Sequence, residues 1–497
     1  MMDNTRTYLL DEPELVFGHG QFEEDPRVGL TLFGPYDLNE SYHPEKINYG
    51  LIGTKQGVDK FEKFADIITQ SVITDSDNQK LWVPFPGFSS AYHAKFPTTS
   101  VKYLLDEKRL NHDSRLFDPY ERSNKLVDYY IEKLEIIKKL DQHIGVVICV
   151  IPDFVYDNCR PKSKVKDTVG KKRSKKMIKS SKEKQLDLIS TIDPGIYDHS
   201  VDFRRQLKAR ALEIEIPIQL IRESTLKPND ESEFGERDLT PLSDRAWNLS
   251  NAIYYKCGGK PWKLSSLREG VCYVGITFKR TDDKNTACCA AQMFLDSGDG
   301  IVFLGEYGPW YSVDKQFHLP REKAYNLLAG TLRTYEQLHG KKLKEIFLHS
   351  HSTIDEEEFQ GYKDATPEGV KITGIRIRKE YSSGLKLFRY GKYPVLRGAV
   401  LLNNENSCFL WSNGYKPKIE SYDGWEVPKP IRVDIEHGEN DILRVAQDVL
   451  SLTKLNYNAC HLSESMPITI GYSSSVGEIL VNSPKHIKPR PNFKYYI

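Results

Sequence analysis

Apolar and polar positions in the first half of the chain alternate between runs typical of buried strands and spacings typical of helices. Short apolar runs predict strands at 27–34, 47–53, 144–153 and 214–223. Helical spacing of apolar residues predicts helices at 57–69, 122–142, 200–213 and 243–256. The run IGVVICVIPD (144–153) is apolar almost throughout, as in a parallel strand buried on both faces. Strand and helix in alternation predict a Rossmann-like α/β sheet here.

After Glu269 the pattern changes. Residues 270–280 alternate between apolar and polar, and 290–306 read as two strands around an SGDG turn. Helices are predicted at 321–340 and 441–456, and further strands at 343–351, 369–379, 398–403, 407–412, 430–436 and 466–472. A hairpin sheet followed by a helix and a parallel strand is typical of an RNase-H-like layout. The fold class predicted is therefore α/β, with a Rossmann-like domain followed by an RNase-H-like domain.

The amino-acid composition is consistent with the predicted α/β fold and indicates which class of protein to expect. The chain has 497 residues, of which 39% are hydrophobic and 28% charged, which favours a soluble, folded, multidomain protein. No apolar run is long enough to span a membrane, and the first residues do not resemble a signal peptide. None of the eight cysteines forms a CxxC pair, so we expect reduced thiols in a cytoplasmic protein.

The formal net charge of +1 gives no argument for a nucleic-acid partner, so any such argument needs local clustering. Residues 160–184 hold twelve Lys or Arg against Asp167 and Glu183. This segment reads equally well as a solvated insertion loop or as a flexible basic arm that contacts phosphates.

A second cationic group lies at the predicted Rossmann-like sheet. Arg204 and Lys208 are four residues apart, so on a helix they leave the same face. Gln219 lies near the end of a strand, and Lys256 closes the next helix before Gly258. A guanidinium fork, two ammonium groups and an amide at strand carboxyl ends suit a terminal phosphate. The plainer alternative is a solvated basic helix face, with Lys256 complementing the helix dipole.

Four segments carry a resemblance to a known family: FRRQLKARALEIEIPIQLIREST, AWNLSNAIYYKCGGKPWKL, GVCYVGITFKR and LTKLNYNAC…SMPITIGYSSSVGEIL. They occur in the order found in the MID and PIWI domains of Argonautes. The chain most resembles the short prokaryotic Argonautes, in the branch that pairs with TIR–APAZ effector proteins. The resemblance implies an N-terminal part of MID at 1–140, a MID core at 141–268 with the basic insertion 160–184, and a PIWI domain at 269–497.

The resemblance also implies a function. Arg204, Lys208, Gln219 and Lys256 match the positions that hold the 5′-phosphate of a guide strand, and the carboxylate of Ile497 would join them with Mg²⁺. The guide would be RNA and the target single-stranded DNA, with no membrane involved. The partner would be a TIR–APAZ protein bound as a heterodimer, which forms a higher oligomer on target binding. The partner would then deplete NAD in defence against plasmids or phage.

The catalytic carboxylates of PIWI nucleases match Thr277, His351 and Ser474 here, and none of these is an acid. Thr and Ser do not gather Mg²⁺ as Asp does, so we expect an inactive PIWI domain rather than an enzyme. An alternative is a nuclease with ligands from His349, His351, Asp355 and the Glu run 356–358. A third hypothesis is a guide-independent scaffold that binds nucleic acid through 160–184.

Four further polar or basic residues late in the chain are candidate contacts to nucleic-acid backbone: Lys454, Asn456, Arg376 and Arg378. Exposed strand faces explain any one of them equally well.

Overall fold

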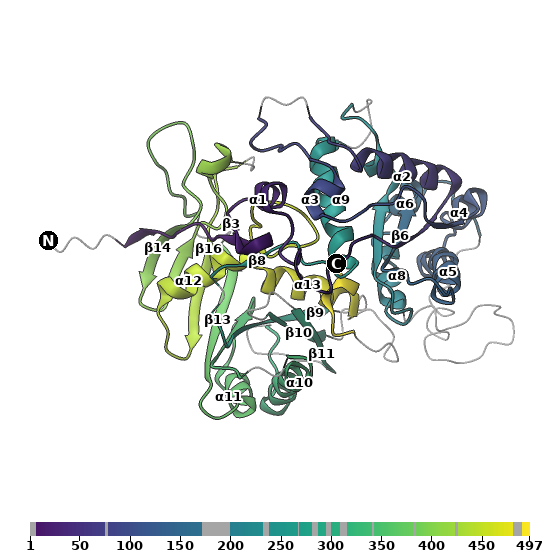
Figure 1. Cartoon of the computed structure of the whole chain (residues 1–497). Helices are drawn as coiled ribbons and strands as arrows, with labels where there is room; N and C mark the ends of the chain where they lie inside the picture. Colours follow the sequence, from purple (N-terminus) through teal and green to yellow (C-terminus); the bar gives the residue numbers. More distant parts are fainter. Residues whose placement is uncertain are drawn as a thin grey trace, which may run out of the picture.

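The computed structural model describes residues 6–74, 78–170, 199–231, 238–266, 268–280, 287–294, 300–308, 316–339, 342–380, 384–422, 426–480 and 490–497. In this part of the chain two large sheets form the centres of two α/β units (Figure 1). A three-stranded sheet made of β2 (Leu15–Val16), β3 (Phe22–Glu23) and β8 (Lys263–Leu264) joins the start of the chain to the segment between the units.

The first unit is a four-stranded parallel sheet in the order β5-β4-β6-β7. Its strands are β4 (Tyr49–Gly53), β5 (Val101–Leu104), β6 (Val146–Ile151) and β7 (Ile218–Arg222). Its longer helices are α2 (Lys55–Ile68), α9 (Leu242–Lys256), α5 (Pro119–Lys138) and α8 (Phe203–Ala211). Side chains of α2 and α9 pack on one face, and those of α5 and α8 on the other. This confirms the predicted Rossmann-like arrangement.

Shorter helices complete this unit: α3 (Phe88–Tyr92), α4 (Glu107–Asp113) and α6 (Asp153–Asn158). The first 140 residues therefore supply two of its four strands, β4 and β5. They also supply β1 (Thr7–Leu9), which pairs with an edge strand of the other sheet. The N-terminal segment is thus built into both units.

The second unit is a nine-stranded mixed sheet in the order β1-β14-β15-β16-β13-β12-β9-β10-β11. Its other strands are β9 (Val271–Arg280), β10 (Ala287–Phe294), β11 (Gly300–Gly308), β12 (Glu345–Ser350), β13 (Lys371–Lys379), β14 (Ala399–Asn404), β15 (Ser407–Leu410) and β16 (Ile431–His437). Strands β9, β10 and β11 are antiparallel, whereas β12 runs parallel to β9. The predicted RNase-H-like layout is therefore confirmed.

Helices cover both faces of the nine-stranded sheet. Residues of α10 (Arg321–His339) and α11 (Glu356–Ala365) share a core with one face. Residues of α12 (Ile442–Ser451) and α13 (Ile468–Leu480) pack on the other. Helix α13 crosses β9 so closely that a Cβ at Gly275 would lie 2.0 Å from the Thr469 carbonyl oxygen. Glycine at this position allows α13 to lie directly on the sheet.

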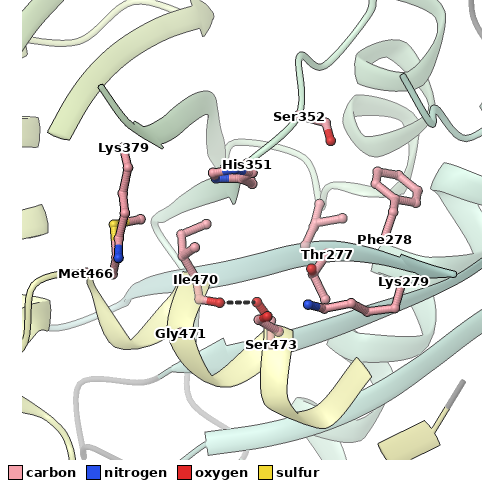
Figure 2. Close-up of a pocket in the computed structure, with 12 residues that line it drawn as sticks. Thr277, Phe278, Lys279, His351, Ser352, Lys379, Met466, Ile470, Gly471 and Ser473 are labelled. Atoms are coloured by element: carbon pink, nitrogen blue, oxygen red, sulfur yellow. Dashed lines mark hydrogen bonds between the residues drawn. The ribbon is translucent and has the colours of Figure 1, made fainter. Parts of the chain in front are cut away.

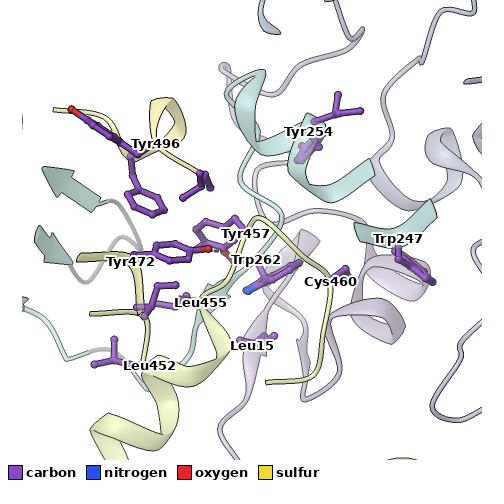
Figure 3. Packing of buried hydrophobic residues seen from close by; sticks show 14 of the residues in the cluster. Leu15, Trp247, Tyr254, Trp262, Leu452, Leu455, Tyr457, Cys460, Tyr472 and Tyr496 are labelled. Carbon is purple, nitrogen blue, oxygen red and sulfur yellow. Dashed lines mark hydrogen bonds between the residues drawn. The ribbon is translucent and has the colours of Figure 1, made fainter. Parts of the chain in front are cut away.

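The two units share one hydrophobic core, part of which appears in Figure 3. Trp262 follows the first unit, and its indole donates a hydrogen bond to the Lys454 carbonyl at 3.0 Å. The Tyr457 hydroxyl donates to the Trp262 carbonyl at 3.0 Å, and the Asn251 amide donates to the Tyr457 carbonyl at 2.9 Å. Because buried aromatic rings and hydrogen bonds cross the boundary together, the units hold a fixed relative position.

Two predicted strands are wrong. Residues 27–34 lie in helix α1 (Pro26–Phe33), where the Asp25 side chain caps the helix by accepting from the Arg27 amide at 2.9 Å. Residues 466–472 lie largely in α13, although Ile468, Thr469 and Ile470 favour strands by intrinsic preference. Packing against β9 decides this segment instead.

Some predictions fall outside the described residues: the SGDG turn and most of the basic insertion, from residue 171 onward. Six cysteines in the described part are free thiols, as predicted: Cys149, Cys159, Cys257, Cys272, Cys408 and Cys460. Among the described residues, none of the helices combines the length and the apolar character that crossing a membrane requires.

Candidate nucleic-acid interface

The predicted phosphate-binding residues converge at one end of α8 and α9. The Lys256 ammonium, at the last residue of α9, donates to the Gln219 amide oxygen on β7. The Lys208 ammonium, on α8, donates to the Tyr496 carbonyl at 2.9 Å. Lys208 and Lys256 are 3% and 1% exposed, whereas Arg204 is an exposed residue. We call these four residues (Arg204, Lys208, Gln219 and Lys256) the cation pocket.

The cations of this pocket act on one another. Burial, followed by the charge of Arg204, lowers the pKa of Lys256 to about 7. Burial, followed by the charges of Lys256 and Arg204, lowers the pKa of Lys208 well below its usual range. Cys257 is the only group opposing these shifts among those that act on the two lysines. Within the described residues neither lysine has a carboxylate partner, and buried cations of this kind suit an anionic ligand, which would restore their charge.

The last residues of the sequence pack beside the cation pocket. Phe493, Tyr496 and Ile497 are buried, and the Phe493 ring stacks on Tyr472 with centroids 4.0 Å apart. The Tyr496 hydroxyl donates to the Arg490 carbonyl at 3.0 Å. This anchoring brings Ile497 next to the carbonyl that Lys208 contacts, as the predicted role of its carboxylate requires.

A cavity of about 450 Å³ adjoins the cation pocket at the carboxyl ends of β6 and β7. Arg204 lines it together with Arg160, the first residue of the basic segment 160–184, and with Arg205 and Arg222, which were not predicted as site residues. The guanidinium groups of Arg160 and Arg222 lie 4.8 and 4.4 Å from the centroid of the Tyr156 ring. Arg222 is the last residue of β7. Because ligands of parallel α/β sheets bind at the carboxyl ends of the strands, Arg222 could have been predicted as a ligand-binding residue.

Thr277, His351 and Ser474, predicted to replace catalytic carboxylates, line one pocket of about 510 Å³ (Figure 2). They come from β9, from the residue after β12 and from α13. Neither Asp nor Glu is among the twelve described residues that line it. Three segments far apart in the sequence thus meet in one pocket, which we call the PIWI pocket after the predicted domain.

The metal site predicted from His349, His351, Asp355 and the Glu run does not assemble. His349 is buried within β12, where its Nδ1 lies 2.9 Å from the Thr469 hydroxyl, whereas His351 lies beyond the strand end. In the described residues, the group close enough to share an ion is His318, Asp355 and Glu358. Asp355 caps α11 by accepting from the Glu358 amide at 2.7 Å, so this group also has a structural explanation.

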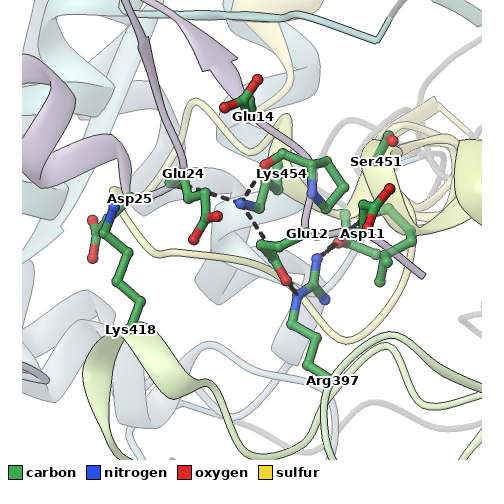
Figure 4. Close-up of polar contacts among 12 residues, drawn as sticks. Asp11, Glu12, Glu14, Glu24, Asp25, Arg397, Lys418, Ser451 and Lys454 are labelled. Carbon is green, nitrogen blue, oxygen red and sulfur yellow. Dashed lines mark hydrogen bonds and ion pairs between the residues drawn. The ribbon is translucent and has the colours of Figure 1, made fainter. Parts of the chain in front are cut away.

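Lys454, predicted to contact nucleic acid, is buried instead (Figure 4). Its ammonium lies 2.7 Å from a Glu12 carboxylate oxygen and donates to the carbonyls of Pro13 and Glu24. Glu12 also binds the buried Arg397 guanidinium at 2.9 Å. Lys454 is therefore unavailable for a phosphate, because it fastens the N-terminal segment to the second unit.

Asn456 is also engaged within the protein: its amide donates to Glu464 at 2.6 Å and accepts from the Tyr472 hydroxyl. Arg376 and Arg378 differ, because both are partly exposed on the same face of β13. The Nε atom of each is buried without a hydrogen-bond partner, and the Arg376 guanidinium lies 3.7 Å from the Glu436 carboxylate. These two arginines remain candidates for backbone contacts.

We compared the sequence and the fold of this chain with those of known proteins. No protein-family model matches the chain. Protein argonaute from Aquifex aeolicus is 23% identical over 300 residues, which are 59% of this chain and 38% of that protein. The chain thus spans well under two thirds of this curated relative.

Solved structures agree. A Clostridium butyricum Argonaute bound to a guide DNA and a 19-mer target DNA matches all of this chain and 55% of its own, with a TM-score of 0.62 and 16% identity. Drosophila Piwi matches 98% of this chain and 56% of its own, with a TM-score of 0.58 and 11% identity. By sequence and structure, the neighbours of this chain are Argonaute and Piwi proteins, and it has their fold.

Proposed function

We propose that this chain is an Argonaute-type protein that binds a guide strand by its 5′-phosphate and uses it to recognise complementary nucleic acid. The observation that carries the proposal is the cation pocket, where two buried ammonium groups and an amide converge beneath an exposed arginine. A terminal phosphate dianion accepts hydrogen bonds from all of these groups. The adjoining cavity, with Tyr156 between two arginines, is large enough for the terminal nucleoside.

A divalent cation fits this pocket only together with the phosphate. Three cationic side chains surround it, and the oxygen of Gln219 already accepts from Lys256. Mg²⁺ would therefore be held by the Ile497 carboxylate and by oxygens of the guide phosphate, whose combined negative charge it offsets.

We further propose, from the sequence resemblance, that the guide is RNA and the target single-stranded DNA. The same resemblance suggests a TIR–APAZ partner, bound as a heterodimer that assembles further on target binding and then depletes NAD in defence. The proposal assigns no NADase activity to this chain.

The experiment that tests guided recognition is capture of a labelled DNA strand by protein loaded with a 5′-phosphorylated guide RNA, with the partner co-expressed. A complementary DNA should be retained, and a strand of the same composition in scrambled order should not. Equal retention of both strands would contradict guided recognition and would favour a sequence-independent scaffold.

We expect no cleavage of the captured strand in either Mg²⁺ or Mn²⁺. The PIWI pocket lacks carboxylates among its described lining residues, so it offers no ligands for two metal ions. The measurement is the length of the target strand on a denaturing gel after prolonged incubation. If cleavage occurs and Glu358→Gln abolishes it, the group of His318, Asp355 and Glu358 would be a catalytic metal site after all.

Guide binding should weaken as pH rises. With a pKa of about 7 in the empty pocket, Lys256 is largely neutral at higher pH, and phosphate binding must return its proton. Affinity for a 5′-phosphorylated oligonucleotide should therefore fall by up to about tenfold for each pH unit above 7. The phosphate itself adds no slope there, because its second pKa is about 6. Lys208, whose pKa is also lowered, adds to this slope, so Lys256→Met should reduce the slope without abolishing it. A flat profile in the wild type, or an unreduced slope in Lys256→Met, would contradict this linkage.

A further inference from the structure

The PIWI pocket carries cations where the resemblance would place metal-binding carboxylates. Lys279 and Lys379 lie on opposite sides of it in Figure 2, with His351, Thr277 and the hydroxyl of Ser474 among the other lining groups. Ammonium and hydroxyl groups donate hydrogen bonds to an oxyanion, whereas a divalent cation needs anionic or carbonyl oxygens. The chemistry of this pocket is therefore that of an anion site.

The two lysines that line the pocket differ in whether an acidic side chain already pairs with them. Lys279 lies 3.3 Å from the Glu478 carboxylate, which also lies 3.2 Å from the Arg205 guanidinium. Lys379, the last residue of β13, is exposed and has no ion-pair partner among the described residues. Its charge is thus the one in the pocket most open to a ligand.

His351 adds a directed group. Its Nδ1 lies 3.1 Å from the Ile377 carbonyl, so this nitrogen must carry a hydrogen and donate it. The Nε2 atom is left for another partner: it accepts a hydrogen bond in the neutral ring and donates to an anion only in the protonated ring. Because the Ile377 contact orients the ring, the position of the Nε2 atom is set before any ligand arrives.

We propose that the PIWI pocket binds a backbone phosphate of the target strand directly, without a divalent metal ion, through Lys379 with help from His351 and the hydroxyl groups. The proposal rests on the proposed function, since it requires a guided target strand. It gives the protein a means to hold the target at the position where a nuclease would cut it, while leaving it intact.

The test is a scan of the DNA target with one uncharged methylphosphonate linkage at successive positions, measured with guide-loaded protein after addition of excess EDTA. Retention of a labelled guide RNA is checked in the same samples, so that loss of the guide is not mistaken for loss of target binding. At one or two adjacent positions, loss of the charge should weaken binding about fivefold in the wild type. Lys379→Ala should weaken binding of the unmodified target by a similar factor and should be insensitive to the same linkage. The matched control is Lys371→Ala, an exposed lysine at the other end of the same strand, which should behave as the wild type.

Outcomes of this scan separate the two proposals. If the unmodified target binds only with its complementary guide but no linkage couples to Lys379, the phosphate site is refuted and guided recognition stands. Coupling that appears only with Mg²⁺ present would refute direct binding. If target binding does not depend on the guide at all, the proposed function fails first. Competition by inorganic phosphate at low millimolar concentration, without a positional effect, would show a site for free anions instead and would overturn the proposal.

Discussion

Replacing both buried lysines of the cation pocket by methionine should weaken binding of a 5′-phosphorylated oligoribonucleotide about a thousandfold. Each lysine would contribute a charge-assisted hydrogen bond to the phosphate, worth about 1.5–3 kcal/mol, and every 1.4 kcal/mol is tenfold in affinity. Lys208→Met with Lys256→Met keeps the side-chain volume close to that of the wild type. The measurement is the dissociation constant from fluorescence anisotropy, with a 5′-hydroxyl oligoribonucleotide of the same sequence as reference.

The 5′-hydroxyl oligoribonucleotide shows whether the loss of affinity is due to the phosphate. The double variant should lose most of its preference for the phosphorylated strand, because the phosphate keeps only Arg204 and Gln219 of the four pocket residues. Stability should change little, since removing mutually repelling buried cations offsets the loss of their bonds to Gln219 and Tyr496. Arg210→Met is a matched control on the same helix, where Arg210 pairs with Asp128 away from the pocket. An unchanged phosphate preference in the double variant would place the guide end elsewhere.

Glu12→Gln should destabilise the protein by about 3–5 kcal/mol, the usual cost of removing one partner from a buried ion pair. The Glu12 carboxylate lies between two cations, Arg397 and Lys454, whose side chains are almost fully buried. Burial raises the pKa of Glu12, but the two cations outweigh burial and hold it below the usual range. The measurement is the free energy of unfolding from urea titration.

The pH dependence of stability shows whether the unpaired charge of Lys454 destabilises the Glu12→Gln variant. Burial lowers the pKa of Lys454 to about 8 although Glu12 opposes the shift, so without Glu12 it should fall further. The variant should recover stability as pH rises, because Lys454 can then lose its uncompensated charge. In the wild type, the contribution of Glu12 should be lost only as pH falls through its lowered pKa. Glu420→Gln removes an exposed ion pair with Lys80 and should cost less than about 1 kcal/mol. Equal effects of the two substitutions would contradict the structural role of Glu12.

The order of helices and strands was largely predictable, and the two errors have physical reasons. Residues 27–34 form a short apolar run that periodicity alone assigns to either type. The Asp25-Pro26 pair before it is a helix start signal, with a capping carboxylate and proline in the first turn, and it was overlooked. For α13 no local signal outweighs its β-branched residues, because its conformation depends on packing against β9 around Gly275.

Some residues of the candidate sites were likewise predictable from the sequence, and others were not. The spacing of Arg204 and Lys208 predicted that both leave one helix face, whereas their grouping with Gln219 and Lys256 in one phosphate pocket was predicted from the resemblance. The burial of Lys454 could not be predicted, since its partner Glu12 lies far away in the sequence and no local pattern links them. His318 was missed for the same reason, because its neighbours Asp355 and Glu358 meet it only in the folded chain.

Whether the cation pocket holds the 5′-phosphate of a guide strand is tested by comparing two oligoribonucleotides that differ only in that phosphate. Each is titrated against the wild-type protein at a pH below the pKa of Lys256. We predict that the phosphorylated strand binds at least about a hundredfold more tightly, as expected for several charge-assisted hydrogen bonds in a buried pocket. Equal affinity for the two strands would contradict the assignment of the cation pocket as the anchor of a guide strand.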